Sequence, residues 1–541
     1  MPAPDVPTPD VPTPDVPTSA CDVLVVGAGP TGVMAACWLA RCGVDAVVVD
    51  GKAGPTRESR ALALQARTLE VYDQLGVVDR VLERARVADA VAPGYERRSF
   101  GRVELGELGG GVTPYPRIHV LEQSENERLL VEHLQRLGGR VRWGHRLTAL
   151  RDGDGGASGA GGTSGGASGE GPGVVAELQG PHGAVRVRAR YCIGADGASS
   201  TVRSLRGIPF EGVTNAGTFF VADAAGVRGL VPGAVNARPG ATSFLLTFPM
   251  GAGERHRLVG LVQDADGDGA VDEGDVRALL QRVYGVVWGP TTWSSTYRVH
   301  HRVAATFRDG PVLLAGDAAH VHSPVGAQGM NTGLQDAHGL ALKLVDVLAG
   351  TASDASLDRY DAERRPVARH LVSTTDRAFG VITSQRPLAR LVRTRVVPRV
   401  VPLAVRAVPR VRGASRVFEY VAQVRIHYWM SEEARTASGA RRGRVVGRRL
   451  PWTGENHAVL RSATWQVHCY GPGDDAAARA LAQRLGTPVH AFAPCPARGL
   501  DAGTALLVRP DGFVAAAAPL ERAAEELPRA LPDRHPARRA G

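Results

Sequence analysis

Residues 21–40 read CDVLVVGAGPTGVMAACWLA, and this stretch decides the fold. The apolar run Val23–Val26 predicts a buried strand, and the residues after the glycines predict a helix. Gly27, Gly29 and Gly32 have the spacing G-x-G-x-x-G at the turn between them. Gly27 permits the tight turn, Gly29 lets the backbone approach a pyrophosphate, and Gly32 lets the helix pack closely on the strand. The stretch therefore predicts a Rossmann-like dinucleotide site.

The next strand supports this interpretation. The run AVVVD, residues 46–50, ends at Asp50. A carboxylate there suits a ribose 2′-hydroxyl and repels a 2′-phosphate, which favours resident NAD or FAD over NADP. The amides of the helix start, around Pro30 and Thr31, are expected to hold the phosphates. The fingerprint alone does not distinguish NAD from FAD.

Composition excludes several other functions. The 541 residues suggest about three domains. The net charge is +10, but aromatic residues make up only 5% of the chain, so we expect no nucleic-acid partner. No apolar run is long enough to predict a membrane span. Six cysteines without a CxxC pair indicate reduced thiols in a cytoplasmic protein. His320 and His322 lie two residues apart without further ligands, so no metal site is expected.

Two later stretches each follow a predicted strand. Residues 192–203 read CIGADGASSTVR, with Asp196 and Gly197 at a strand-to-helix turn. Residues 316–333 read GDAAHVHSPVGAQGMNTG and follow the apolar run Val312–Ala315. The second stretch leads into a predicted helix, which is a layout that suits an anionic or dipolar ligand at the helix start.

Together, in this order and spacing, the three motifs resemble the flavoprotein aromatic monooxygenases of the para-hydroxybenzoate hydroxylase type, over about residues 20–380. The resemblance implies an α/β fold with three parts. These are a Rossmann-like FAD-binding domain of the glutathione reductase type, an α+β substrate domain, and a C-terminal thioredoxin-like α/β domain. The implied cofactor is non-covalent FAD, with NADPH or NADH and O2 as cosubstrates.

The resemblance also implies roles for individual residues. Asp317 would bind a ribityl hydroxyl of FAD, and the flavin ring would lie along a loop whose backbone amides stabilise the reduced flavin. Arg60 in SRALALQARTLEVYDQLG would reach the pyrophosphate, and Gln123 in LEQSENERLL would contact the cofactor. Leu147 would contact adenine, and Asp196 would serve both FAD and NAD(P)H. The flavin-edge loop comprises Pro324, Gly326, Gly329, Met330 and Asn331. No catalytic residue is certain, although Pro324 and Gly326 lie at the reactive edge.

The loop departs from the family pattern at three positions. Ser323, Val325 and Ala327 replace the Pro, Thr and Gly that are often found there. The backbone amides are expected to keep their role despite these changes. The sequence does not determine the shape of the pocket beside the flavin edge.

The implied activity is hydroxylation of a polycyclic aromatic polyketide through a flavin C4a-hydroperoxide. Two alternatives keep the cofactor: Baeyer–Villiger insertion on a related polyketide, and phenol or antibiotic-inactivating hydroxylation. A third is a flavin- or nucleotide-binding protein without oxygenase activity. Candidate substrate-pocket residues are Phe220, Phe244, Phe248 and Trp293. The protein is expected to be a monomer or homodimer.

The expected domains follow from these motifs and from composition. They are a disordered proline-rich arm at 1–19, FAD-binding residues 20–207 with a flexible Gly/Ser loop at 152–173, a substrate-binding sheet domain at 208–300, further FAD-binding residues 301–380, a helical connector at 381–444, and a thioredoxin-like domain lacking CxxC at 445–541.

Overall fold

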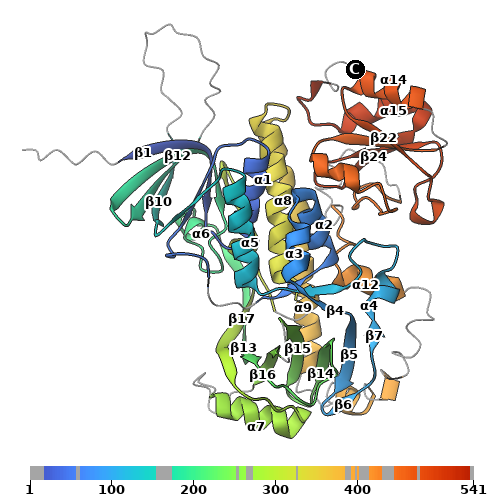
Figure 1. Ribbon diagram of the computed structural model, residues 1–541. Helices are drawn as coiled ribbons and strands as arrows, with labels where there is room; N and C mark the ends of the chain where they lie inside the picture. Colours follow the sequence, from blue (N-terminus) through green and yellow to red (C-terminus); the bar gives the residue numbers. More distant parts are fainter. Residues whose placement is uncertain are drawn as a thin grey trace, which may run out of the picture.

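The computed structural model has a mixed α/β fold made of four β-sheets with helices packed around them (Figure 1). It describes residues 17–56, 61–153, 173–251, 255–262, 272–323, 327–383, 391–396, 399–400, 402, 414–428, 444–471 and 475–536. Arg60, Pro324, Gly326, most of the Gly/Ser segment and most of the expected connector lie outside these residues.

The first sheet carries the three motifs at one edge. Its strands are β10 (Arg146–Asp152), β11 (Val174–Gly180), β12 (Gly183–Gly194), β1 (Thr18–Val26), β2 (Ala46–Asp50) and β9 (Val141–Trp143), with β19 (Val312–Leu314) and β18 (Arg308–Asp309) beside the end of β12. β1, β2, β12 and β19 are parallel where they pair, and Val26, Gly194 and Leu314 are in register. The turns that follow these strands therefore meet at the carboxyl edge of the sheet, where ligands of open α/β sheets bind.

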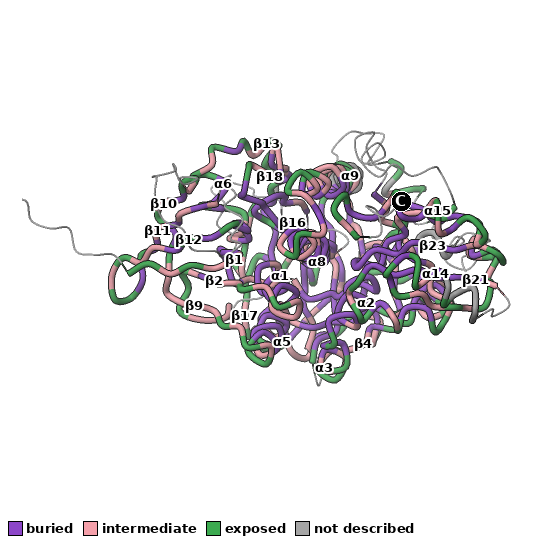
Figure 2. The backbone as a smooth tube through the Cα atoms, turned by 90° about the horizontal axis from the view of Figure 1, so that it is seen from above, coloured by how far each residue is buried: buried purple, intermediate pink, exposed green. Residues whose placement is uncertain are grey.

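Three helices lie side by side along this sheet: α1 (Pro30–Arg41), α5 (Gln123–Arg136) and α8 (Gly329–Leu348). Residues 32–39 of α1 are all buried, since the helix contacts both α5 and α8 (Figure 2). The other helices of this region are α2 (Ala66–Leu75), α3 (Val78–Arg84), α6 (Thr201–Leu205) and α9 (Asp358–Thr383). The 3-10 turns η1 (Gly316–Ala318) and η2 (Asp354–Leu357) precede α8 and α9.

The second sheet forms the lower half of the molecule in Figure 1. Its order is β20 (His320–Val321), β17 (Thr291–Ala304), β13 (Phe210–Ala224), β16 (Arg255–Val262), β15 (Phe244–Met250), β14 (Ala234–Pro239), β5 (Ala90–Tyr95) and β6 (Arg98–Ser99), with β7 (Val103–Glu104) paired to β5. Helix α7 (Glu273–Tyr284) packs on this sheet through apolar side chains that include Leu280.

This sheet is wider than the sequence predicted. The expected substrate sheet was confined to residues 208–300, but β5, β6 and β7 extend it with residues 90–104. The reason is the parallel pairing of β5 with β14, a contact between segments far apart in the chain. A small third sheet links the two halves through β3 (Ala63–Leu64), β8 (Ile118–Val120) and β4 (Arg86–Ala88), next to α4 (Leu105–Gly109) and α12 (Ala414–Val421).

The C-terminal unit has a four-stranded sheet in the order β22 (Val489–Phe492), β21 (Gln466–Tyr470), β23 (Thr504–Val508), β24 (Val514–Pro519). β21 and β22 are parallel and are joined through α14 (Asp475–Leu485), whereas β23 and β24 form an antiparallel hairpin. α15 (Ala523–Glu526) follows. Short turns complete the described elements: the π-turn η3 (Val392–Val396) and the 3-10 turns η5 (Ala458–Ser462), η6 (Pro496–Arg498), η7 (Leu520–Arg522) and η8 (Leu527–Ala530).

The tip of the C-terminal hairpin inserts charged side chains into the first unit. Arg509 donates to both carboxylate oxygens of Glu363 on α9, at 2.8 and 3.1 Å. Lys343 of α8 lies 2.8 Å from the same carboxylate. Burial opposes ionisation of Glu363, but Arg509 and Lys343 outweigh it and hold its pKa well below the usual range. A buried ionic network therefore joins the two units.

One boundary at the N-terminus was wrong. The arm was expected to reach residue 19, but β1 begins at Thr18, which pairs with Arg186 of β12. Residues 1–16 lie outside the described residues. In the described part of the chain, no helix combines the length and apolar character needed to cross a membrane.

Candidate functional site

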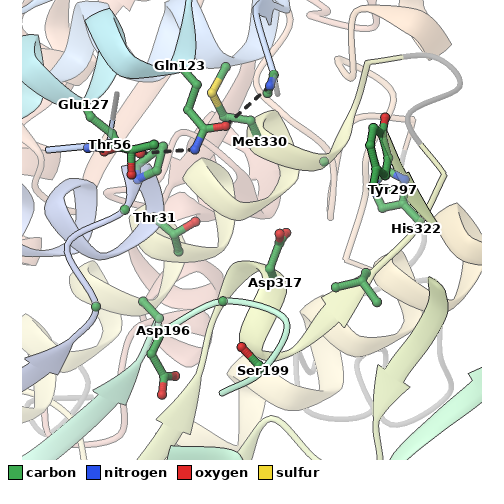
Figure 3. Close-up of a pocket in the computed structure, with 18 of the residues that line it drawn as sticks. Thr31, Thr56, Gln123, Glu127, Asp196, Ser199, Tyr297, Asp317, His322 and Met330 are labelled. Carbon is green, nitrogen blue, oxygen red and sulfur yellow. Dashed lines mark hydrogen bonds between the residues drawn. The ribbon is translucent and has the colours of Figure 1, made fainter. Parts of the chain in front are cut away.

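A cavity of about 960 Å³ lies between the carboxyl edge of the first sheet and the second sheet (Figure 3). Most of the cofactor residues predicted from the sequence line it: Gly27, Gly29, Pro30, Thr31, Asp50, Gln123, Leu147, Asp196, Asp317, Gly329 and Met330. The structure thus brings together motifs that are almost 300 residues apart in the chain.

The fingerprint glycines have three distinct environments. Gly27 has φ +104°, and a Cβ there would lie 2.4 Å from the Ala195 carbonyl oxygen. A Cβ on Gly32 would lie 1.9 Å from the Gly27 carbonyl oxygen, so Gly32 serves packing and does not line the cavity. A Cβ on Gly29 would meet nothing within 4 Å. Gly29 therefore keeps open a space that the protein itself does not fill.

Two helices begin at the cavity. Gly29 is the N-cap of α1, and Gly329 is the first residue of α8. Among the described residues, no side chain caps either helix, and neither first turn contains an acidic residue. The uncapped backbone amides and the positive dipole ends of both helices thus face the same cavity. This arrangement, with the open surface at Gly29, fits a diphosphate at α1 and a developing anion at α8.

The turn before Asp317 is packed tightly against α1. Gly316 has φ +61°, and a Cβ there would lie 2.5 Å from Thr31 Oγ1. A Cβ on Gly333 of α8 would also lie 2.5 Å from Thr31 Oγ1. This close approach leaves the Asp317 side chain exposed within the cavity wall (Figure 3).

Asp50 is partly engaged by the fingerprint turn. Its Oδ2 accepts a hydrogen bond from the Ala28 amide at 2.7 Å, and its Oδ1 accepts one from the Lys52 amide at 2.8 Å. The carboxylate still lines the cavity. A ribose contact by Asp50 would therefore be added to a structural role in holding the turn.

The Asp196 carboxylate is largely occupied by hydrogen bonds within the turn that follows it. It accepts hydrogen bonds from Ser200 Oγ at 2.5 Å and from the Thr201 amide at 2.7 Å, at the start of α6. In Figure 3 its carboxylate points away from Thr31 and Asp317. Contact of Asp196 with FAD or NAD(P)H stays a prediction, and its backbone is better placed for that contact than its side chain.

Gln123 and Glu127 act together on α5. Gln123 Nε2 donates to Glu127 Oε1 at 3.1 Å, and Glu127 Oε2 accepts from the Thr56 amide at 3.0 Å (Figure 3). Both side chains line the cavity, as does Thr56. Sequence reasoning found Gln123 but missed Glu127, although the i,i+4 spacing on one helix was available as a signal.

Asn331 was predicted to bind the cofactor, but its side chain does not line the cavity. It is fully buried, and its amide nitrogen donates to the carbonyl oxygens of Ala63 at 2.7 Å and Ala327 at 3.0 Å. Its Oδ1 accepts from the Gln65 amide and from Thr68 Oγ1. Any contact of Asn331 with the cofactor would fall to its backbone.

His320 and His322 lie two residues apart, but their surroundings and hydrogen-bond partners differ. His320 Nε2 lies 2.7 Å from Asp336 Oδ2 in the buried core. Burial alone would raise the pKa of Asp336, but the charges of Arg364 and His320 outweigh it and hold that pKa at about 2. In the described part of the chain, no group of three or more His, Cys, Asp or Glu residues is arranged to hold a metal.

His322 lines the cavity beside Tyr297, across from Thr31 and Gln123 (Figure 3). Removal from water and the nearby His320 lower the pKa of His322 to about 4, so the ring is neutral at pH 7. Nδ1–H donates to the Ser323 carbonyl oxygen at 2.7 Å, and the buried Nε2 has no hydrogen-bond partner among the described residues. No pattern in the sequence distinguishes the two histidines in this way.

The far wall of the cavity comes from the second sheet and carries a group of apolar side chains beside Tyr297, Arg298 and His300. Phe248, one of the four predicted pocket residues, lines it together with Leu246, Val259 and Val299. Phe220, Phe244 and Trp293 do not line the cavity, so those three predictions were wrong. The first two are buried in neighbouring core clusters, and Trp293 packs 5.4 Å from the Arg257 guanidinium. Phe220 faces the other side of the sheet together with Leu245, whereas Phe244 shares the face of Leu246 and Phe248 but packs against Phe219. The sequence alone did not determine the strand register or these contacts.

Comparison with known proteins extends these observations. Residues 20–375 match the family model described as FAD binding domain. The 12-dehydrotetracycline 5-monooxygenase/anhydrotetracycline 6-monooxygenase of Streptomyces rimosus is 32% identical over 537 residues, with 94% of this chain and 98% of that protein covered. The tetracenomycin B2 monooxygenase-dioxygenase of Streptomyces olivaceus is 31% identical, with 91% and 94% covered.

Solved structures agree over nearly the full length. The OxyS anhydrotetracycline hydroxylase from Streptomyces rimosus matches with a TM-score of 0.72 and 29% identity, covering 95% of this chain and 98% of that one. CabE, described as an aromatic hydroxylase from angucycline biosynthesis, matches with a TM-score of 0.70 and 28% identity, covering 93% and 96%.

Proposed function

The chain belongs to the FAD binding domain family, and from this premise we propose that it is an NAD(P)H-consuming monooxygenase that hydroxylates a polycyclic aromatic polyketide. One observation carries the proposal: a single cavity joins two uncapped helix starts and the open surface at Gly29 to an apolar wall on the second sheet. The first half suits a dinucleotide cofactor, and the second half suits a flat apolar substrate.

The residues present fit FAD. Gly29 and the first amides of α1 would hold the diphosphate, and Asp50 and Gln123 would face the adenosine half. Asp317 would accept from the ribityl chain, and the amides of Gly329 and Met330 would lie along the ring. Arg60, Pro324 and Gly326 are proposed members of the same site. When bound, FAD accepts a hydride from NADPH or NADH and, once reduced, activates O2 to transfer one oxygen atom to an aromatic carbon.

The chain itself contributes electrostatics and exclusion of water. The start of α8 places a positive dipole end where negative charge develops on a reduced ring. Leu246, Phe248 and Val299 keep the substrate side apolar. His322 is neutral at pH 7, so it adds no positive charge to the field of the helix start.

The substrate class rests on the relatives. By their names, the Streptomyces proteins described above act on 12-dehydrotetracycline, anhydrotetracycline and tetracenomycin B2, and their matches cover more than nine-tenths of this chain. The solved relatives carry the name hydroxylase, which favours hydroxylation over the Baeyer–Villiger alternative.

We also propose that the C-terminal unit is a thioredoxin-like domain. Its β-α-β segment followed by a β-hairpin and a helix supports this assignment. The sequence has no CxxC pair, so we assign it a structural role at the interface with α8 and α9. The domain boundaries given above, a cytoplasmic location and a monomeric or homodimeric state complete the proposal.

The direct test uses the full-length protein. We expect yellow protein as purified, with NADPH or NADH oxidation that rises on addition of tetracyclic or angucyclic phenols. The product should gain one oxygen atom by mass spectrometry and a new aromatic hydroxyl by NMR. A colourless protein that releases no flavin on denaturation would refute the cofactor assignment. Yellow protein whose NAD(P)H oxidation no aromatic substrate stimulates would refute the hydroxylase assignment alone.

A further inference from the structure

One residue of the cavity wall has an unfavourable backbone conformation. Ala327 has φ +53°, in the left-handed region that L side chains rarely adopt. Among the described residues, the other non-glycine residues with positive φ are Glu96, Gln423 and Ala463. Ala327 is the one of these four that lines the cavity.

The surrounding structure holds Ala327 in this conformation. Its carbonyl oxygen accepts a hydrogen bond from Asn331 Nδ2 at 3.0 Å. Asn331 is fully buried, and its other hydrogen bonds join it to Ala63 and Gln65 before α2 and to Thr68 within α2. A strained residue that its surroundings fix so firmly at a cavity wall indicates a functional constraint.

The methyl group of Ala327 reaches the substrate side. It packs against the apolar cluster that contains Phe248 and Met250 of β15, and Leu246 packs there too. Leu246 and Phe248 line the same cavity as Ala327. The methyl group therefore lies at the corner where the residues directly before α8 meet apolar side chains of the second sheet. Glycine would adopt the same φ without strain, but it would leave this corner empty.

We propose that Ala327 is a specificity-determining residue whose methyl group limits how far an aromatic ring can move from the wall at β15 toward the start of α8. This inference rests on the proposed function and deepens it. The limit on ring position selects the carbon that faces the reactive edge. It also favours a flat fused-ring substrate, which can lie against Leu246 and Phe248 in one register.

The test compares three residues at one backbone conformation. Glycine adopts the left-handed region freely and asparagine adopts it more readily than alanine, so Ala327→Gly and Ala327→Asn change the side chain and keep the turn. Ala463→Gly is the matched control, because Ala463 has φ +54° and lies outside the cavity wall. Substrate dissociation constants are measured on the holoenzyme from the flavin absorbance change, with polycyclic phenols of two to four fused rings as probes.

We expect Ala327→Asn to raise the substrate dissociation constant at least tenfold, since the added bulk enters the corner. We expect Ala327→Gly to at least halve the product formed per NAD(P)H consumed and to give a second regioisomer. FAD affinity should stay within about twofold of wild type in both, and Ala463→Gly should match wild type in substrate affinity, product yield and regiochemistry.

Unchanged substrate affinity, product yield and regiochemistry in both Ala327 variants would overturn the inference while leaving the proposed function intact. A parallel loss of FAD affinity would also overturn it, because the methyl group would then serve the cofactor loop. A wild-type holoenzyme that binds none of the probes would refute both the inference and the proposed function.

Discussion

Arg203 donates a hydrogen bond from its NH1 group to the carbonyl oxygen of Ala318, at 2.8 Å. Its NH2 group donates to the Ala198 carbonyl oxygen at 2.8 Å, and its guanidinium lies 3.8 Å from the Phe210 ring centroid. One buried side chain therefore joins the turn after Asp196 to the turn after Asp317. The Arg203 guanidinium therefore holds the two cavity motifs at a fixed distance from each other.

Arg203→Lys should separate these two turns, because the lysine ammonium cannot reproduce the planar guanidinium that donates hydrogen bonds to both carbonyl oxygens. We expect FAD affinity to fall about tenfold, equivalent to roughly 1.4 kcal/mol, measured by fluorescence titration of the apoprotein. Arg188→Lys, an exposed position on β12, is the control and should bind FAD like wild type. Equal FAD affinity in Arg203→Lys would show that the fork does not position the site.

Gly333→Ala should disrupt the contact between α1 and α8. The added Cβ would lie 2.5 Å from Thr31 Oγ1 and 3.2 Å from the Gly316 Cα, so the Thr31 side chain must shift and the contact with the Gly316 backbone is tight. We expect a loss of about 2 kcal/mol in unfolding free energy, measured by denaturant titration. Gly339→Ala on the same helix meets only Tyr428 Oη at 3.8 Å and should be neutral or slightly stabilising. If the two variants unfolded alike, the packing argument would be wrong.

Arg509→Met should destabilise the junction with the C-terminal unit, because the buried Glu363 carboxylate loses the guanidinium that donates to both of its oxygens. Breaking a buried pair from one side costs about 3–5 kcal/mol. Arg522→Met, which removes an exposed helical pair with Glu526, should change stability by less than about 0.5 kcal/mol. Chemical denaturation of both variants measures the contrast, and a small effect at Arg509 would refute a structural role for this interface.

The stability of the protein should fall as pH falls below 6.5. Burial lowers the pKa of His457 from 6.5 to about 4, so the unfolded chain takes up the proton first. The contribution of neutral His457 is therefore present above pH 6.5 and is lost as pH falls toward 4. His457→Gln keeps a donor for the Leu450 carbonyl oxygen but cannot be protonated. We expect it to reduce the loss of unfolding free energy between pH 7 and pH 5 by about 2 kcal/mol. An unaltered pH dependence would contradict the pKa assignment.

The features that the sequence predicted correctly depend on short local patterns of residues. Each motif is a strand followed by a glycine-containing turn, and strands that run in parallel must end at one edge, so the convergence of Gly29, Asp196 and Asp317 was predictable. Residues 445–541 were expected to form a small α/β unit, and β21, α14 and the hairpin of β23 and β24 lie there.

What the sequence did not predict depends on contacts between distant segments. The pairing of β5 with β14 widened the substrate sheet, the strand register turned Phe220 away from the cavity, and Phe244 packs in a separate core cluster with Phe219. The turn Pro510-Asp511-Gly512 has the composition of an exposed loop, yet Asp511 and the preceding Arg509 are both buried, against α2 and α9. Only the docking of the whole C-terminal unit determines that burial.

The central claim is that the diphosphate of FAD lies against Gly29, and Gly29→Ala tests it most directly. Gly29 has φ −73°, an ordinary value for alanine, and its added Cβ would meet no protein atom within 4 Å. The variant should therefore unfold at the wild-type denaturant concentration as apoprotein, while its FAD dissociation constant, measured by fluorescence titration, should rise at least a hundredfold. A Gly29→Ala protein that binds FAD with wild-type affinity would contradict the account.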